Sequence, residues 1–305
     1  MQVLYAFFHS EDKSIAAHEK ELFSSFERTY DLYIFLLLLL IEIREQGREL
    51  INIRKGKRLP TSEDINPNTK FIDNKIFSII SVNRQLAAES KKRNLNWEGH
   101  KDIAQKIFSS ITESQAYKSY MSIPARSFKE DKKFISTIYL EIIAQSELLQ
   151  YHFEEKNIHW VDDVDFVNSL VLKTIDYIPE SAMDDLPLAK LYKDEAEDKK
   201  FTKDLFRKII EHSDEEDKMI QSKTENWELE RIAFMDVLIM KMAITEFLYF
   251  PTIPVKVSLN EYIELAKQYS TPKSSVFVNG ILDKLLAEFK SDGRLQKQGR
   301  GLVEN

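Results

Sequence analysis

The chain has no cysteine, and glycine and proline are scarce, with 7 and 8 residues among 305. The missing thiols exclude disulfides, iron–sulfur clusters and cysteine-based zinc sites, and they fit a reducing compartment, so we expect a cytoplasmic protein. Glycine-rich phosphate loops, tight hairpins and Rossmann turns all require glycine, and their scarcity disfavours these architectures. Leucine, isoleucine, lysine and glutamate are abundant instead, which indicates a mostly helical protein.

Long hydrophobic runs are also absent. The longest candidate, Ile34 to Ile41, contains eight consecutive apolar residues, whereas a membrane-spanning helix needs about 20. Asp31 and Glu42 bracket the run, and the first residues show neither the basic region nor the cleavage site of a secretory signal. We therefore expect a buried helix and no membrane association.

The hydrophobic pattern predicts an all-α fold. Apolar residues recur at three- and four-residue steps in a long segment from about residue 14 to 57, and this spacing is typical of amphipathic helices. The composition shifts between Pro179 and Pro187, which is the best candidate for a domain boundary. We predict a helical region over residues 1–190, a second helical domain over 191–290, and a flexible basic tail over 291–305.

The last third of the chain carries the clearest signals. From Ile232 to Phe250 the sequence is apolar on nearly every side, which predicts a central, buried helix; the exceptions are Asp236, Lys241, Thr245 and Glu246. Ser258 to Glu261 has the spacing of a capping box that would start the next helix. Thr271 and Pro272 predict the beginning of the last helix, and Gly280 within it predicts a close approach of two helices.

Residues with catalytic spacing are not evident. No histidine pair has the i, i+4 spacing of zinc enzymes, and no nucleophile elbow or Walker loop occurs. Glu154–Glu155 and Asp162–Asp163 are possible carboxylate pairs, but without a partnering motif they are more typical of solvated helix ends. We expect no catalytic residues, no metal site, no cofactor and no enzymatic activity.

Three stretches are rich in basic residues: residues 44–58, residues 91–93 and the C-terminal tail from residue 290. Clusters of this kind can bind the phosphates of a nucleic acid, although a solvated helix end is the commoner meaning of any one of them. The overall charge of −7 gives RNA binding no help, so any such binding depends on a local patch.

Four phrases in one region, taken together, resemble the NusB transcription antitermination family. They occur in the order and spacing of that family: Met242–Phe247 (MAITEF), Ile253–Glu261 (IPVKVSLNE), Ile263–Lys267 (IELAK) and Phe277–Lys284 (FVNGILDK). The region spans Ile232 to Leu286, about a fifth of the chain, with a looser match near residues 195–230. Met1 to Ala6 also resembles the first helix of the family.

The resemblance implies two small helical bundles and a role in transcription rather than catalysis. Members of the family pair with NusE, a protein of the small ribosomal subunit. The pair holds the boxA RNA element of a nascent transcript and acts on the transcription elongation complex. Binding suppresses premature termination, notably on ribosomal RNA operons.

The motif alignment also implies which residues make these contacts. The positions that match the NusE-binding surface of the family are Tyr5, Glu230 and Asp236. The positions assigned to RNA are Lys273, Phe277, Lys256 and Asn279, the last two with less clear roles. The residues themselves leave other interpretations open, because Tyr5 and Phe277 lie on apolar stripes that suit a core, and Asp236 needs a partner for its charge if it is buried.

Two departures from the family stand out. The family usually has an arginine-rich arm before its first helix, and that arm grips RNA; either it lies upstream of Met1 or the basic stretches replace it. Residues 10–190 also exceed the usual family length and resemble an inserted helical region. A helical scaffold without RNA binding therefore remains the alternative. An RNA methyltransferase with a NusB-like domain is disfavoured, because it needs a glycine-rich cofactor domain and a catalytic cysteine.

Overall fold

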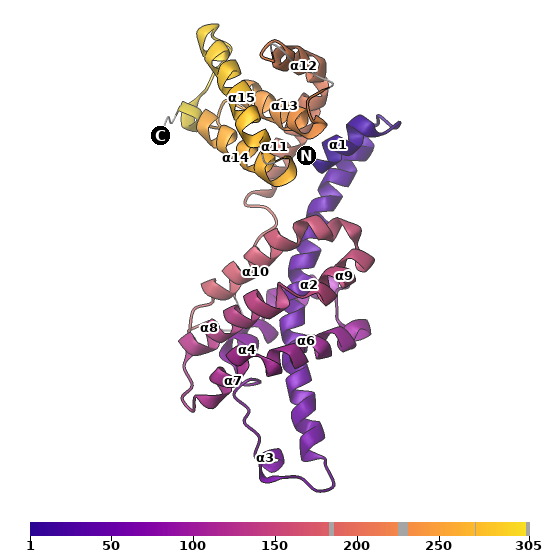
Figure 1. Ribbon diagram of the computed structural model, residues 1–305, viewed down its shortest axis with the longest axis vertical. Helices are drawn as coiled ribbons and strands as arrows, with labels where there is room; N and C mark the ends of the chain where they lie inside the picture. The colour runs from indigo at the N-terminus through magenta and orange to yellow at the C-terminus, as the bar shows by residue number, and fades with distance from the viewer. Residues whose placement is uncertain (183–185, 225–230, 272, 303–305) are drawn as a thin grey trace. The chain divides into compact units, whose positions relative to one another are not determined.

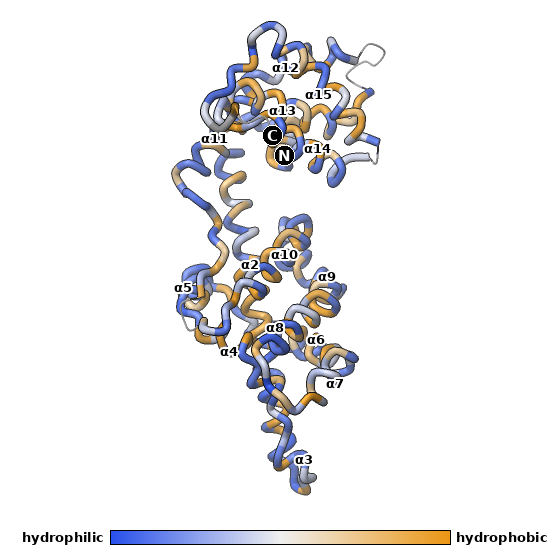
Figure 2. Tube along the Cα trace, turned by 90° about the vertical axis from the view of Figure 1, so that its left-hand side faces the viewer, coloured by the Kyte–Doolittle hydropathy of each residue, from blue (hydrophilic) through white to orange (hydrophobic). Residues whose placement is uncertain are grey.

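The computed structural model describes residues 1–182, 186–224, 231–271 and 273–302, and every regular element within these ranges is a helix (Figure 1). The predicted all-α fold is therefore confirmed. Along α6 (Lys101–Glu113) and α8 (Phe128–Ile138) hydrophobic and hydrophilic residues alternate around the helix (Figure 2). Both helices bury their apolar side, as amphipathic helices of a folded core do.

The chain divides into two compact units. Unit 1 comprises Met1–Phe23 and Tyr192–Asn305, and unit 2 comprises Ser24–Leu191. This division groups the first helix with the C-terminal region, and residues 24–191 form a unit of their own. Helix α2 (Ile15–Lys55) begins in unit 1 and continues into unit 2.

The remaining helices fall into these two units. Those of unit 1 are α1 (Gln2–His9), α11 (Glu195–Glu211), α12 (Ser213–Gln221), α13 (Phe234–Tyr249), α14 (Val255–Tyr269), α15 (Ser274–Ser291) and the short η5 (Gly299–Leu302). Those of unit 2 are α3 (Ser62–Ile65), α4 (Lys75–Ser81), α5 (Arg84–Arg93), η1 (Glu98–His100), α6, α7 (Gln115–Ser122), α8, the π-helical turn η2 (Tyr139–Ile143), α9 (Glu147–Lys156), η3 (Ile158–Asp163) and α10 (Val164–Tyr177).

Helix α13 is the centre of unit 1. It contacts α1, α11, α12, α14 and α15, and its residues from Asp236 to Phe247 are all buried. The prediction of a central buried helix over 232–250 is confirmed. Because water is excluded from α13 between Asp236 and Phe247, each polar side chain in this stretch needs a partner inside the protein.

Each of the four polar side chains of α13 finds that partner on a neighbouring segment. The ammonium group of Lys241 donates to Ser213 and Asp217 of α12, both at 2.7 Å. Thr245 donates to Glu216 of α12 at 2.5 Å. Glu246 accepts hydrogen bonds from Ser258 and Tyr262 of α14 at 2.5 and 2.8 Å. The fourth, Asp236, bonds to the segment before α15. These bonds fix which helix lies on which side of α13.

Three local predictions for this region are wrong. Helix α14 begins at Val255 after Pro254, so Ser258 lies inside the helix and binds Glu246 instead of capping the helix. Helix α15 begins at Ser274 with Lys273 as its N-cap, so Thr271 lies ahead of the cap, and Pro272 is outside the described residues. A Cβ added at Gly280 would meet no atom within 4 Å, so this glycine marks no close helix approach.

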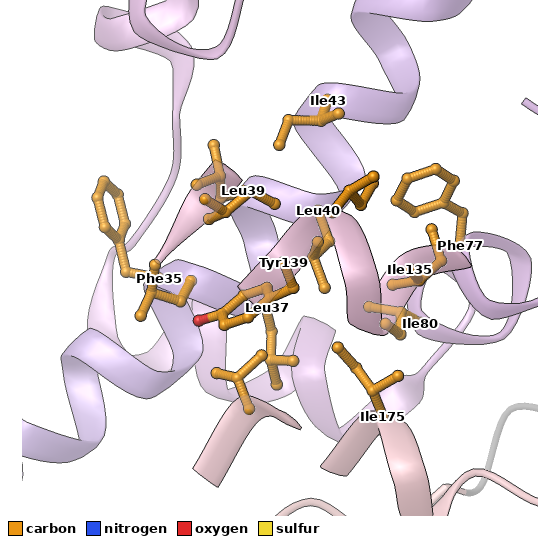
Figure 3. Close-up of a cluster of buried hydrophobic side chains, with 14 of the residues drawn as sticks. Phe35, Leu37, Leu39, Leu40, Ile43, Phe77, Ile80, Ile135, Tyr139 and Ile175 are labelled. Carbon is orange, nitrogen blue, oxygen red and sulfur yellow. The ribbon is translucent and has the colours of Figure 1, made fainter. Parts of the chain in front are cut away.

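The core of unit 2 is built around the middle of α2. The run Ile34 to Ile41 is almost entirely buried, as predicted, and Leu37 and Leu40 lie in a cluster with side chains of α4, α8 and α10 (Figure 3). The ring of Phe35 stacks on Trp97, with 4.2 Å between the ring centroids. In the part of the chain that the structure describes, no helix is both long and apolar enough to cross a membrane.

A glycine in α2 admits its neighbouring segment at close range. A Cβ at Gly47 would lie 3.0 Å from side-chain atoms of Phe71 and Ile72, which is closer than side chains normally pack. The guanidinium of Arg44, one turn earlier, donates to the backbone oxygen of Ile72 and to two serines of α4. The absence of a side chain at Gly47 therefore allows residues 71–72 to pack on α2.

The predicted tail makes several contacts with unit 1. Leu295 packs against its core, Arg294 forms ion pairs with Glu288 and Asp292, and Lys297 donates to the last carbonyl groups of α13. Burial lowers the pKa of Lys297 to about 8. Residues 294–297 thus contact the core of unit 1 and the end of α13, and the predicted flexibility of the tail over 291–305 stays a prediction.

The carboxyl group of Glu216 makes unit 1 sensitive to pH. Burial raises its pKa to about 8, so folded chains hold a proton that unfolded chains release above about pH 4.5. The unfolding free energy should therefore fall as pH rises from 5 to 8, by up to about 1.4 kcal/mol per pH unit. Urea unfolding should show this loss for the wild type and a smaller loss for Glu216→Gln.

Glu215 provides the matched control, because it is the neighbouring glutamate and is exposed. Glu215→Gln removes the same charge and should keep the pH dependence of the wild type. Equal pH dependence in the wild type and Glu216→Gln would show that Glu216 is ionised in the folded protein.

Candidate functional site

Three of the predicted site residues meet around one pocket of unit 1. Asp236 lies in the first turn of α13, and Lys273 and Phe277 lie at the start of α15. All three line a pocket of about 270 Å³. The pocket is completed by Arg231, Ile232, Ala233, Thr271 and Ser274. A residue predicted to bind a protein therefore lies beside two that were predicted to bind RNA.

The carboxylate of Asp236 holds the segment that leads into α15. It accepts a hydrogen bond from Ser270 at 2.5 Å and one from Ser274 at 2.8 Å, and the two serine hydroxyls are 3.0 Å apart. Only 5% of Asp236 is exposed. Its predicted role in partner binding stays a prediction, whereas its contacts in the structure position the backbone on which Lys273 lies.

Lys273 and Phe277 occupy different environments. Lys273 is exposed, and in the described part of the chain it makes no ion pair. Phe277 is half-buried and packs against the core of unit 1. One part of its ring therefore belongs to the core, and the other part is open to a ligand. An exposed cation one helical turn from a partly exposed ring can contact a phosphate and an unstacked base.

Tyr5 belongs to an aromatic group next to this pocket. Its ring stacks on His9 with 4.2 Å between centroids, and both rings meet Phe234 edge-on, at 5.5 and 4.5 Å. Tyr5 is 42% exposed and Phe234 is 36% exposed. Phe234 directly follows Ala233 of the pocket lining. Exposed aromatic rings of this kind are frequent anchors of protein–protein interfaces.

The other predicted residues lie elsewhere. Lys256 is exposed in the first turn of α14, and Asn279 of α15 donates to Asp283 at 3.0 Å. Neither belongs to the described lining of the pocket. Glu230 lies outside the described residues.

Sequence reasoning missed Arg231, Phe234 and His9. Arg231 adds a second cation to the pocket lining. Its only signal was a basic residue just before a buried helix. Phe234 was hidden within an apolar run, and nothing in the sequence indicated that this residue is 36% exposed. His9 was recognisable only as the residue one turn after Tyr5.

The chemistry of this site suits binding. It offers two cations, serine and threonine hydroxyls and a partly exposed ring around a small pocket. Among the described residues, no group of three or more histidine, aspartate or glutamate side chains is placed to hold a metal ion.

Comparison with known proteins matches part of the chain to one family. Residues 169–287 match the model of the NusB family. The match begins within α10 and ends within α15, so it includes Asp236 and both predicted RNA residues of the pocket.

Curated relatives carry the same family name. The chain is 47% identical over 103 residues to "Transcription antitermination protein NusB" of Salinibacter ruber, which covers 34% of this chain and 64% of that protein. It is 49% identical over 106 residues to the protein of that name from Chloroherpeton thalassium, and the match covers 35% of this chain and 50% of that protein. The chain is 43% identical over 90 residues to the protein of the same name from Thermodesulfovibrio yellowstonii, and the match covers 30% of this chain and 60% of that protein.

The chain thus spans between half and just under two thirds of the length of these relatives. No solved structure matches it. The family match over 169–287 and the identities of 43–49% agree with the phrases found in the sequence, and residues 169–287 are similar to the NusB family.

Proposed function

We propose that the chain is a transcription antitermination factor that binds boxA-type RNA together with NusE, in the cytoplasm, on the transcription elongation complex. The observation that carries this proposal is the single pocket lined by Asp236, Lys273 and Phe277. The curated relatives, each named "Transcription antitermination protein NusB", support it.

The pocket alone gives weak RNA binding. A base stacked on one aromatic ring contributes about 1–3 kcal/mol, and Lys273 offers one contact to a phosphate. The net charge of −7 repels RNA at long range. Stable binding therefore requires further contacts, and we assign part of them to the protein partner.

The aromatic group of Tyr5, His9 and Phe234 is the surface that suits this partner. Its rings are rigid and partly exposed, so they can be covered at little cost in side-chain entropy. Because Phe234 adjoins the pocket lining, a protein bound at the aromatic group would lie next to RNA bound at Lys273. This arrangement accounts for a protein and an RNA that bind jointly.

The first prediction concerns the RNA residues. Phe277→Ala should lower the affinity for boxA RNA, measured with NusE present, at a nearly unchanged salt dependence, because it removes a ring and no charge. Lys273→Ala should flatten the plot of log affinity against log salt by about one unit, as for one lost phosphate contact. Fluorescence anisotropy over a salt series measures both quantities.

Two neighbours on α15 serve as controls. Val276 is 76% exposed and lies beside Phe277, and Lys284 is an exposed lysine two to three turns further along. Val276→Ala and Lys284→Ala should bind RNA as the wild type does. If all four variants bind RNA as well as the wild type does, the pocket is not the RNA site. If the wild type itself binds no RNA, the alternative of a helical scaffold without RNA binding gains support.

The second prediction concerns the partner. Tyr5→Ser should weaken the complex with NusE at least about tenfold, since truncation of an interface aromatic often costs 2 kcal/mol or more. Isothermal titration calorimetry measures this loss. Tyr177→Ser, which changes a tyrosine that is 77% exposed on unit 2, is the matched control and should have no effect. Normal NusE binding by Tyr5→Ser would place the partner elsewhere.

A further inference from the structure

The basic stretches found in the sequence differ in how their charges are used. Arg93 forms ion pairs with Glu27, Asp31 and Glu89. Arg44 is buried and bonded to backbone and serine oxygens, and Arg294 of the tail is paired with two carboxylates. These arginines hold the fold together and are not available to a ligand.

The C-terminal end of α2 is different. Arg54, Lys55 and Arg58 are exposed, and none of them has an ion pair within the part of the chain that the structure describes. Lys57 alone is paired, with Asp64 at 3.0 Å. Residues 44–133 contain 19 basic and 11 acidic residues, a net +8, whereas residues 134–185 contain 2 and 11, a net −9. Unit 2 thus has a strongly basic part although the whole chain is acidic.

A pocket of about 320 Å³ lies beside Arg54, the first of these cations. Arg54 lines it together with Asn66 and Tyr117, and the buried rings of Phe71 and Phe108 lie against it. Gly47 also lines the pocket, and a side chain there would press on Phe71 and fill space at the pocket wall. The pocket therefore has aromatic walls and a polar lining that includes one cation, Arg54, and one carboxylate, Glu63.

Two polar groups of the lining are unused. The hydroxyl of Tyr117 and the side-chain amide of Asn66 make no hydrogen bond to any described residue. Burial raises the pKa of Tyr117, and the positive charge of Arg54 opposes that change, which places the guanidinium within electrostatic range of the ring. Single-stranded RNA is recognised by such a combination, in which bases meet aromatic side chains and hydrogen-bond along their edges while cations contact the phosphates.

We propose that this α2-end site, formed by Arg54, Lys55, Arg58, Asn66 and Tyr117, binds a nucleotide of single-stranded RNA. The base enters the pocket beside Tyr117 and Asn66, and the three cations contact the flanking phosphates. The proposal rests on the proposed RNA-binding function and gives unit 2 a part in it. An apolar protein segment is the competing occupant, because Ile53 and Leu59 at the same end are 68% and 88% exposed; the three unpaired cations favour RNA.

The charge test uses the full chain, NusE and a fluorescein-labelled single-stranded RNA that carries boxA. The triple variant Arg54→Ala/Lys55→Ala/Arg58→Ala should bind at least about tenfold more weakly at moderate salt, and its salt slope should be flatter by about two units, at roughly 0.7 per lost contact on a single strand. The control Lys91→Ala/Lys92→Ala/Lys129→Ala removes three exposed lysines of the same unit and should change neither value appreciably.

The pocket test uses one ring. Tyr117→Leu should weaken RNA binding by about five- to hundredfold at an unchanged salt slope, since it removes an aromatic contact and no charge. Tyr151→Leu is the control, because Tyr151 is a tyrosine of unit 2 that is 67% exposed. Circular dichroism verifies that each variant keeps its helices.

The outcomes separate this site from the pocket of unit 1. If the wild type binds RNA, Lys273→Ala and Phe277→Ala weaken binding, and the α2-end variants equal their controls, the α2-end site is wrong and the proposed function stands. If the α2-end variants alone weaken binding, the α2-end site stands and the pocket of unit 1 is wrong. If the wild type binds no RNA, both are wrong.

Discussion

The buried polar side chains of α13 are the constraint on which unit 1 depends. A helix surrounded by five others cannot leave a carboxylate or an ammonium group without a partner, because its desolvation would cost several kcal/mol. Asp236, Lys241, Thr245 and Glu246 each bond to a particular neighbouring segment. Apolar packing alone would tolerate sliding and rotation of these helices, whereas the four sets of bonds select one arrangement.

The same constraint reaches the candidate site through Asp236. Its two serine partners belong to the segment that carries Lys273 into α15, so the position of the exposed cation is fixed by a buried carboxylate. These bonds join α13 to the start of α15 at the site. The aromatic group of Tyr5 extends the site toward α1, and this geometry suits the proposed binding of a protein and an RNA side by side.

Much of this could be predicted from the sequence, and the rest could not for physical reasons. The all-α fold and the buried helix over 232–250 follow from periodicity, and the NusB phrases led to Asp236, Lys273 and Phe277. Ser258 was misread because a serine followed by glutamate three residues later also fits a helix interior, where Ser258 binds the distant Glu246. Gly280 is exposed, while the close approach occurs at Gly47. Partners distant in sequence leave no local pattern, which is also why Arg231 and the pocket beside Tyr117 were missed.

The most direct test of this account is a double-mutant cycle on RNA affinity, measured with NusE present. If Asp236 acts by positioning the segment before α15, Asp236→Ala should lower the affinity although its side chain is buried. The double variant Asp236→Ala/Phe277→Ala should then bind only slightly more weakly than the weaker single variant, because both changes damage the same contact surface. Additive losses, or an Asp236→Ala chain that folds and binds RNA as the wild type does, would contradict the claim that this carboxylate holds the site.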